Sequence, residues 1–454
     1  TVTILERIGH FLDRENEDKY RYFKDKGYSK REITDLLARH IDLKEILSLA
    51  ARRWDGGYVM AGMIGHGDAF VMRDPCGIRP AYYYRDDEVV VAASERAVIQ
   101  TTFNVPYENV QELAPGHALL VRRDGDVSDE RFIAPQEVRP CSFERIYFSR
   151  GSDQDIYRER KRLGRLLVPQ ILKSIDDDIE NTVFSYIPNT AESAFFGLVE
   201  GLDAHCAETR VQKIMAGRDT LTEERLHEIL HYKPRIEKIA IKDVKMRTFI
   251  TQDDERDDLV AHVYDVTYGT IRPDADNLVI LDDSIVRGTT LRRSIIRILD
   301  RLRPKKIVVC SSAPQIRYPD CYGIDMSRLG DFVAFRAAIE LLKEHGMHDV
   351  IDDVYRKAKI QMGLERSEAV NCVKKIYEPF TDEEISSKIA QIVTAPDIHA
   401  GIEVIYQSVE NLHQAIPHHN GDWYFTGDYP TPGGNVVANK AFINFYENRN
   451  ERAY

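Results

Sequence analysis

The chain has 454 residues, of which 43% are hydrophobic and 30% charged, and its formal net charge at pH 7 is −12. This length suits two or three domains of ordinary globular composition. An acidic surface argues against nucleic acid as a main partner, and no apolar run approaches the roughly 18 residues of a membrane span, so we expect neither nucleic acid nor membrane as a partner.

The six cysteines are scattered along the chain, and none forms a Cys-x-x-Cys pair. That distribution argues against a zinc site and fits the reducing conditions of the cytoplasm. No signal peptide is recognisable, so we expect a cytoplasmic protein.

Residues 1 to 53 have the apolar periodicity of helices, with Ser29 and Asp42 as N-cap residues. From Asp55 the period changes to that of short strands separated by turns, which predicts an antiparallel α+β unit ending near Ile133. The expected strands are 58–64, 69–72, 81–84, 89–93 and 117–122. Residues 135–140 read as a linker.

The next region predicts a strand at 182–187, which runs into a loop of small residues at 188–194 and then a helix. Residues 207–238 read as an insertion that carries a charged helix starting at Thr222. A short strand at 239–241 precedes Lys242.

The most informative stretch is a continuous apolar run, 278–281, followed by Asp282 and Asp283. Such a run is typical of a strand buried on both faces. A polar, glycine-containing loop follows, and then an amphipathic helix over 291–302. Strand, loop and helix form half of a βαβ unit, whose loop lies where open α/β sheets bind ligands.

The loop chemistry suits a phosphate. The N–H groups from Ile285 to Thr290 precede a helix, and Gly288 allows a close approach of the main chain to an anion. Asp282 and Asp283 would repel a phosphate, so we expect them to face the hydroxyls of a ribose or a magnesium ion. A phosphate beside a vicinal diol describes a ribose 5-phosphate.

The segment Val-Ile-Leu-Asp-Asp-Ser-Ile-Val-Arg-Gly-Thr-Thr at 279–290 resembles the phosphoribosyl pyrophosphate (PRPP) motif of type I phosphoribosyltransferases. Its full form is similar to that of the amidophosphoribosyltransferase family. The segment 141–148 resembles the entry to that family's second domain. Four further segments, 55–58, 73–80, 93–95 and 113–116, resemble the rear half of its glutaminase domain.

The resemblance implies an α/β and α+β chain: a partial N-terminal-nucleophile hydrolase (glutaminase) domain followed by a type I phosphoribosyltransferase domain with a parallel sheet. We expect the first domain to cover residues 1–138 and the second 139–330, including the insertion 207–238. Residues 331–454 are expected to form a helical extension and a tail that pack on the second domain.

The resemblance also implies a site. Thr190, Asp282 and Asp283 would hold Mg2+, and the two aspartates would also bind the ribose hydroxyls. Lys242 and Arg247 match a mobile catalytic loop that neutralises the leaving group. The 5-phosphate would lie against Ser284, Ile285, Val286, Arg287, Gly288, Thr289 and Thr290, and the pyrophosphate against Pro188, Asn189, Thr190 and Ala191.

The implied function is the amidophosphoribosyltransferase step of de novo purine synthesis, in which ammonia from glutamine displaces pyrophosphate from PRPP and gives 5-phosphoribosylamine. The implied partners are PRPP, glutamine or ammonia, and pyrophosphate, with feedback purine nucleotides as further candidates, in a homo-oligomer. The front half of the family's glutaminase domain carries a nucleophilic cysteine. Because this chain has no counterpart of that half, we expect no glutaminase activity from it.

Some members carry an iron–sulfur cluster held by four cysteines. Cys141 matches one ligand position and Cys321 lies next to another, but the segment 420–427 has no cysteine, so we expect no cluster.

One departure leaves an alternative open. Where the family has a basic segment, residues 253–258 read Asp-Asp-Glu-Arg-Asp-Asp. Acidic residues beside a pyrophosphate weaken its binding. The alternative is therefore a non-catalytic homologue that binds PRPP or a nucleotide, and a structural role without a ligand comes third.

Overall fold

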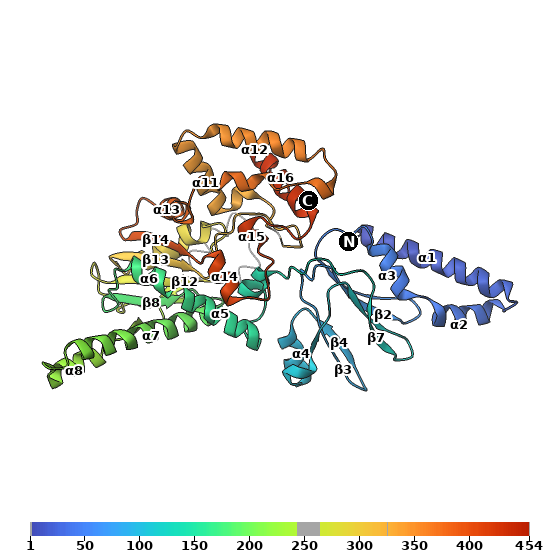
Figure 1. Ribbon diagram of the computed structural model, residues 1–454, viewed down its shortest axis with the longest axis horizontal. Helices are drawn as coiled ribbons and strands as arrows, with labels where there is room; N and C mark the ends of the chain where they lie inside the picture. Colours follow the sequence, from blue (N-terminus) through green and yellow to red (C-terminus); the bar gives the residue numbers. More distant parts are fainter. Residues whose placement is uncertain (1, 243–263, 325, 454) are drawn as a thin grey trace. The chain divides into compact units, whose positions relative to one another are not determined.

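The computed structural model describes residues 2–242, 264–324 and 326–453 (Figure 1). The chain forms two compact units. The first consists of Thr1–Cys141 with two short segments from later in the chain, Cys321–Ile324 and Pro430–Gly434. The second consists of Ser142–Asp320, Asp325–Tyr429 and Asn435–Tyr454. The functional domain boundaries drawn from the sequence stay predictions.

The first unit begins with three helices, α1 (Val2–Asp25), α2 (Lys30–His40) and α3 (Leu43–Ala51). Ser29 caps α2 in a reciprocal capping box with Glu32, and the Asp42 side chain accepts the Glu45 N–H at the start of α3. Both N-caps predicted from the sequence are therefore confirmed. Each side chain satisfies a main-chain donor that the helix itself leaves unpaired.

Two antiparallel sheets follow in this unit. The larger has the order β1-β2-β6-β7, and the smaller has the order β4-β3-β5. Helix α4 (Arg96–Phe103) joins β4 to the rest of the unit. The strands are β1 (Val59–Met63), β2 (Ala69–Arg73), β3 (Tyr82–Arg85), β4 (Val90–Ala93), β5 (Gln111–Glu112), β6 (His117–Val121) and β7 (Val127–Arg131).

Three apolar clusters stack these elements in four layers. Leu43 and Leu47 of α3 pack on Met72 and Leu120 of the larger sheet. The opposite face of that sheet packs on Tyr83 of the smaller sheet, whose own outer face packs on Ile99 of α4. The order of layers is thus helix, sheet, sheet, helix.

The sequence predicted five of the seven strands of this unit but did not predict α4.

The second unit is built on a five-stranded parallel sheet with the order β14-β13-β12-β8-β9 (Figure 1). Every neighbouring pair in it is parallel. This confirms the parallel sheet predicted for the second domain. The strands are β8 (Thr182–Tyr186), β9 (Arg235–Ile236), β12 (Asn277–Asp282), β13 (Lys306–Ser311) and β14 (Gly401–Tyr406).

Helices cover both faces of this sheet. One face packs on α6 (Val168–Ser174) and α7 (Glu192–Ala216). The other packs on α10 (Ile296–Asp300), α11 (Val333–Glu344) and α13 (Asp382–Val393). Helix α5 (Gln154–Leu166) crosses α7 at backbone contact, since a Cβ on Gly164 would lie 1.7 Å from the Ala194 carbonyl oxygen. Only glycine fits that crossing.

The C-terminal third departs from the expectation of a mainly helical extension. It contributes α12 (His348–Gln361), α14 (Val409–Ala415), α15 (Trp423–Thr426) and α16 (Pro432–Tyr446), but also β14, which is an edge strand of the central sheet. Helix α7 likewise continues to Ala216, so the expected insertion begins inside a helix, and its second helix is α8 (Glu223–Leu230). Helix length and sheet membership were set by tertiary packing that local patterns do not reveal.

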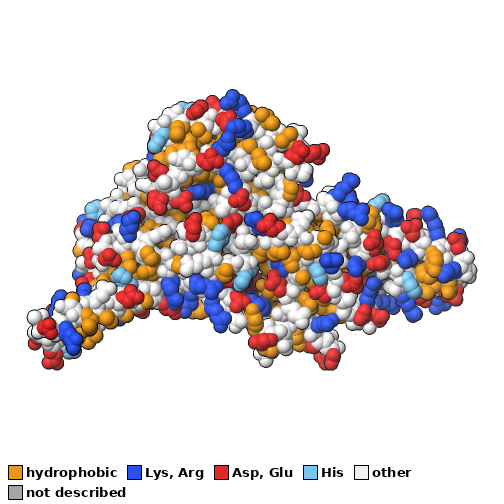
Figure 2. Space-filling view, viewed as in Figure 1, with side chains coloured by type: hydrophobic (Ala, Val, Ile, Leu, Met, Phe, Trp, Pro, Cys, Tyr) orange, Lys and Arg blue, Asp and Glu red, His pale blue; other side chains and the backbone are white. Residues whose placement is uncertain are grey.

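The visible surface carries basic and acidic side chains side by side, without a large area of one sign (Figure 2). Among the described helices, none combines the length and the apolar character that a bilayer crossing requires.

Candidate active site

Strand β12 lies at the centre of the parallel sheet, between β13 and β8. Its residues Leu278 to Leu281 have no exposed surface, as predicted from the apolar run. The strand ends at Asp282, and the loop 283–290 follows at its carboxyl end. This is the edge of an open α/β sheet at which ligands bind.

The Asp282 and Asp283 carboxyl groups lie together at that edge. The main-chain N–H of Asp283 donates to Asp282 Oδ1 at 2.9 Å, and the Ser284 hydroxyl donates to Asp283 Oδ2 at 2.9 Å. Within the described ranges, neither carboxyl forms an ion pair with a lysine, arginine or histidine. The pair is therefore not consumed by a structural salt bridge.

Burial raises the pKa of Asp282 well above its usual value, and the negative charge of Asp283 adds to the effect. Burial also raises the pKa of Asp283, although the Ser284 hydroxyl and the buried Arg160 guanidinium oppose the shift. Two half-buried carboxyl groups that form no ion pair with another described residue are suited to bind a cation or hydroxyl donors.

Two tyrosines adjoin this pair. Burial raises the pKa of Tyr264 to about 12, and the charges of Asp282 and Asp283 contribute to the increase. Burial and the same two charges raise the pKa of Tyr147. Their phenol groups stay neutral donors at physiological pH. Neither tyrosine was singled out from the sequence, because no local pattern reports which distant segments meet at a strand end.

The loop after the aspartates presents unpaired main-chain donors. The N–H groups of Ser284, Ile285, Val286, Arg287 and Gly288 form no hydrogen bond to any other residue that the structure describes. Thr289 and Thr290 are exposed at the start of the helix that follows. A run of unpaired N–H groups before a helix is typical of a phosphate-binding loop.

The loop is held in shape from behind. Gly288 has a φ of +68°, and a Cβ there would lie 3.1 Å from Val333 and from Val393. The Val333 N–H donates to the Val286 carbonyl oxygen at 2.9 Å, and Arg336 Nη2 donates to the Arg287 carbonyl oxygen at 2.7 Å. Helix α11 thus fixes two carbonyl groups of the loop, while the N–H groups of residues 284–288 stay without a partner among the described residues.

The second predicted loop lies beside the first. Strand β8 pairs with β12 so that Tyr186 is opposite Leu281, and the Ile187 N–H donates to the Leu281 carbonyl oxygen at 2.8 Å. Residues 188–191 then lead into α7, with Asn189 exposed and Thr190 half-buried. The peptide bond between Pro188 and Asn189 is cis. The structure therefore brings the two predicted substrate loops to adjacent strand ends.

The predicted catalytic pair is only partly described. Lys242 is exposed at the end of β10 (Ala240–Lys242), directly opposite Tyr264 of the antiparallel β11 (Tyr264–Val266). Arg247 and the acidic segment 253–258 lie outside the described residues.

The donor chemistry fits magnesium better than a transition metal. Among the described residues, no group of three or more His, Cys, Asp and Glu side chains could enclose a metal ion. Two carboxylates and the Thr190 hydroxyl offer oxygen ligands, which Mg2+ prefers, and Mg2+ commonly completes its shell with water and substrate phosphates. Cys141 is buried and Cys321 is half-buried.

Similar proteins were found among curated sequences and solved structures, whereas no family model matches the chain. The chain is 27% identical over 309 residues to the amidophosphoribosyltransferase of Pseudomonas aeruginosa, covering 66% of this chain and 54% of that protein. It is 25% identical over 318 residues to the Escherichia coli amidophosphoribosyltransferase, covering 66% and 56%. The resemblance to amidophosphoribosyltransferases is thereby confirmed.

The chain spans about half the length of these amidophosphoribosyltransferases. Among solved structures, it is similar to the glutamine PRPP amidotransferase of B. subtilis complexed with ADP and GMP. That match has a TM-score of 0.56 and 23% identity, and covers 93% of this chain and 75% of the other. It shows that the chain shares the PRPP amidotransferase fold, which confirms the predicted fold class.

Proposed function

We propose that this chain binds magnesium–PRPP and transfers its phosphoribosyl group to ammonia, as an amidophosphoribosyltransferase of purine synthesis in the cytoplasm. The observation that carries the proposal is that five unpaired N–H donors in the loop 284–288 directly follow two half-buried carboxyl groups, Asp282 and Asp283, which form no ion pair with another described residue. A phosphate accepts from the former, and a ribose diol donates to the latter.

Different residues are proposed to bind different parts of PRPP. Ser284 to Thr290 receive the 5-phosphate, Asp282 and Asp283 accept from the ribose hydroxyls, and residues 188–191 receive the pyrophosphate. Mg2+, held by the two aspartates and Thr190, supplies charge neutralisation to the pyrophosphate. Lys242 and Arg247 are proposed to neutralise the negative charge that develops on the leaving oxygen.

In the proposed reaction, the nitrogen lone pair of ammonia forms a bond to C1 of the ribose while the bond from C1 to the pyrophosphate oxygen breaks. Pyrophosphate leaves with the bonding electron pair, and the new ammonium group loses one proton to give 5-phosphoribosylamine. Water would attack the same carbon, so the site must exclude it. The half-buried aspartates fix the ribose for attack from one side.

The test is pyrophosphate release from PRPP, Mg2+ and ammonium chloride by the chain, compared with an Asp282→Asn/Asp283→Asn double variant. Supplying ammonia directly makes the assay independent of glutamine hydrolysis. The proposal expects release by the unmodified chain and none by the variant. Equal release from both would refute it.

The second candidate function is binding of PRPP or a nucleotide without turnover. The acidic sequence of residues 253–258 favours this alternative, because the amidophosphoribosyltransferase family that the chain resembles has a basic segment at that position. Calorimetric binding of PRPP by a chain that releases no pyrophosphate would select this alternative.

A further inference from the structure

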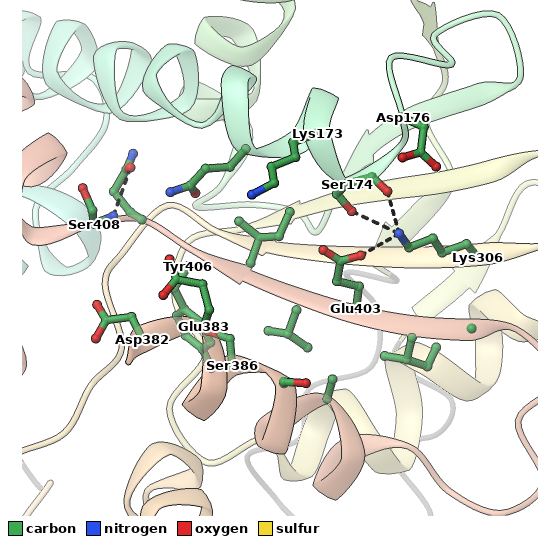
Figure 3. A pocket seen from close by; sticks show the side chains of 18 of the residues that line it. Lys173, Ser174, Asp176, Lys306, Asp382, Glu383, Ser386, Glu403, Tyr406 and Ser408 are labelled. Atoms are coloured by element: carbon green, nitrogen blue, oxygen red, sulfur yellow. Dashed lines mark hydrogen bonds and ion pairs between the residues drawn. The ribbon is translucent and has the colours of Figure 1, made fainter. Parts of the chain in front are cut away.

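The outer edge of β14 forms the floor of a groove in the second unit (Figure 3). β14 is the last strand of the sheet and pairs only with β13 in the described part of the chain. The groove has a volume of about 890 Å3, and α6 and α13 form its two walls. A smaller hollow of about 440 Å3 continues it past Ile402 towards Pro396.

The hydrogen-bonding groups of β14 alternate between the sheet and the groove. The N–H groups of Gly401 and Gln407 donate to the Lys305 and Ser311 carbonyl oxygens of the β13 segment. Because main-chain direction alternates along a strand, the N–H and C=O groups of Ile402, Val404 and Tyr406 point to the open edge. That edge is a template for one more strand.

Each wall carries a charge without an ion-pair partner among the described residues: the α6 side has Lys173, with the acidic Asp176 just beyond the helix, and the α13 side has Glu383 (Figure 3). Both Lys173 and Glu383 are exposed. Lys306 adds a second positive charge on the α6 side, although it donates to the Ser174 carbonyl oxygen at 2.6 Å and contacts Glu403 at 2.5 Å.

We propose that the free edge of β14 is a docking site for an extended segment of another polypeptide, which adds to the sheet as a sixth strand. Such a segment of about six residues would span roughly 20 Å, the length of β14 itself. Its side chains alternate between the walls, so acidic residues on one face meet Lys173 and basic residues on the other meet Glu383.

The shape of the groove favours a single strand over a second copy of this chain. A single extended segment fits between α6 and α13, whereas a second copy would bring its own α6 and α13 to the same edge. An isolated extended segment has no flanking helices of its own. This docking site does not depend on phosphoribosyl transfer.

The test is fluorescence anisotropy with the labelled peptide Val-Lys-Glu-Val-Glu-Lys-Val and the 454-residue chain. In a strand, this peptide presents two glutamates on one face and two lysines on the other. A matched peptide with proline in place of the central valine keeps the charges but cannot pair along its whole length. We expect saturable binding of the first peptide and at least about tenfold weaker binding of the second.

Two variants of the chain complete the design. Val404→Pro removes an N–H that faces the groove and no N–H that faces β13, so edge pairing is lost while the sheet retains its ladder. Lys173→Glu reverses the charge that faces one side of an added strand without touching β14, and Lys343→Glu on α11 is its control away from the groove. We expect at least about fivefold weaker binding for the first two and no change for the third.

Three results would overturn the proposal. Binding that does not saturate by about 1 mM peptide would exclude the site. Equal binding of the valine and proline peptides, or equal binding by the unmodified chain and Lys173→Glu, would exclude strand addition in this groove. A dimer in solution that Val404→Pro dissociates would show that a second copy occupies the edge instead.

Discussion

Arg336, in the first turn of α11, donates a hydrogen bond from Nη2 to the main-chain carbonyl oxygen of Arg287 at 2.7 Å. Arg287 lies in the middle of the proposed phosphate loop, and its side chain forms an ion pair with Asp331 at 3.6 Å. The contact fixes one peptide of the loop from outside the proposed ligand site. Arg336 therefore supports the main-chain N–H donors of the proposed phosphate loop without itself lying in the proposed ligand site.

Replacing Arg336 by methionine keeps most of the side-chain volume and removes this donor. We expect PRPP to bind about three- to tenfold more weakly, because a hydrogen bond of this kind contributes about 0.5–1.5 kcal/mol. Calorimetric titration measures the affinity, and Lys343→Met, an exposed position on the same helix, is the control. An unchanged dissociation constant in Arg336→Met would remove Arg336 from the account.

Gly288→Ala tests the close fit of the loop. Its φ of +68° costs an L-residue about 1–2 kcal/mol, and its Cβ would also lie 3.1 Å from Val333 and Val393. Gly346 has a φ of +70° with nothing within 4 Å of a Cβ, so Gly346→Ala carries the backbone cost alone. We expect urea unfolding to show a larger loss of stability for Gly288→Ala, and only that variant to lose PRPP affinity. Identical behaviour of the two variants would contradict a tightly packed loop.

Asp282→Asn should stabilise the ligand-free protein while abolishing PRPP binding. Burial and Asp283 raise the pKa of Asp282, so ionising it destabilises the folded state, by about 1.4 kcal/mol for each unit of the increase. The amide cannot ionise and removes that cost at neutral pH. Differential scanning calorimetry should give a higher Tm for the variant at pH 8. A lower Tm would mean that the ionised carboxylate is stabilising and that our account of its surroundings is wrong.

The pH dependence follows from the same two carboxyl groups. Their pKa values are higher in the folded chain than the usual value near 3.8, so the folded state binds protons more tightly than the unfolded state. Their contribution to stability is complete below that usual value and is lost as pH rises through the raised pKa values. Magnesium–PRPP needs the ionised carboxylates, so its affinity should rise over the same interval.

Denaturant titrations and PRPP titrations from about pH 4 upwards measure both trends. The Asp282→Asn/Asp283→Asn variant should lack the contribution of these carboxyl groups to either trend. If the unmodified chain and the variant have the same pH dependence of stability, other groups dominate and the raised pKa values have no thermodynamic weight.

The sequence predicted the centre of the site because its signals are local. Four apolar residues ending at Leu281 predicted a strand with no exposed surface, and the caps at Ser29 and Asp42 depend only on neighbours within the next helical turn. The need for a glycine at position 288 was likewise predicted from the sequence of the loop itself. Each of these features is decided by residues close together in the chain.

The rest depends on contacts between distant segments. The charges of Asp282 and Asp283 act on Tyr147 and Tyr264 only because three distant parts of the chain come near one another, and no local pattern predicts that proximity. Similarly, strand β14 was not predicted, because it lies in a region where the sequence indicated helices. Its apolar residues 402, 404 and 405 nevertheless resemble those of other buried strands. Strand order, which made β14 an edge, is a property of the assembled sheet.

The measurement that tests the central claim most directly is a calorimetric titration of the 454-residue chain with PRPP in the presence of Mg2+, repeated with the Asp282→Asn/Asp283→Asn variant. The account predicts saturable binding at a single site in the unmodified chain and its loss in a folded variant. Undiminished binding by the variant, or no binding by the unmodified chain, would contradict it.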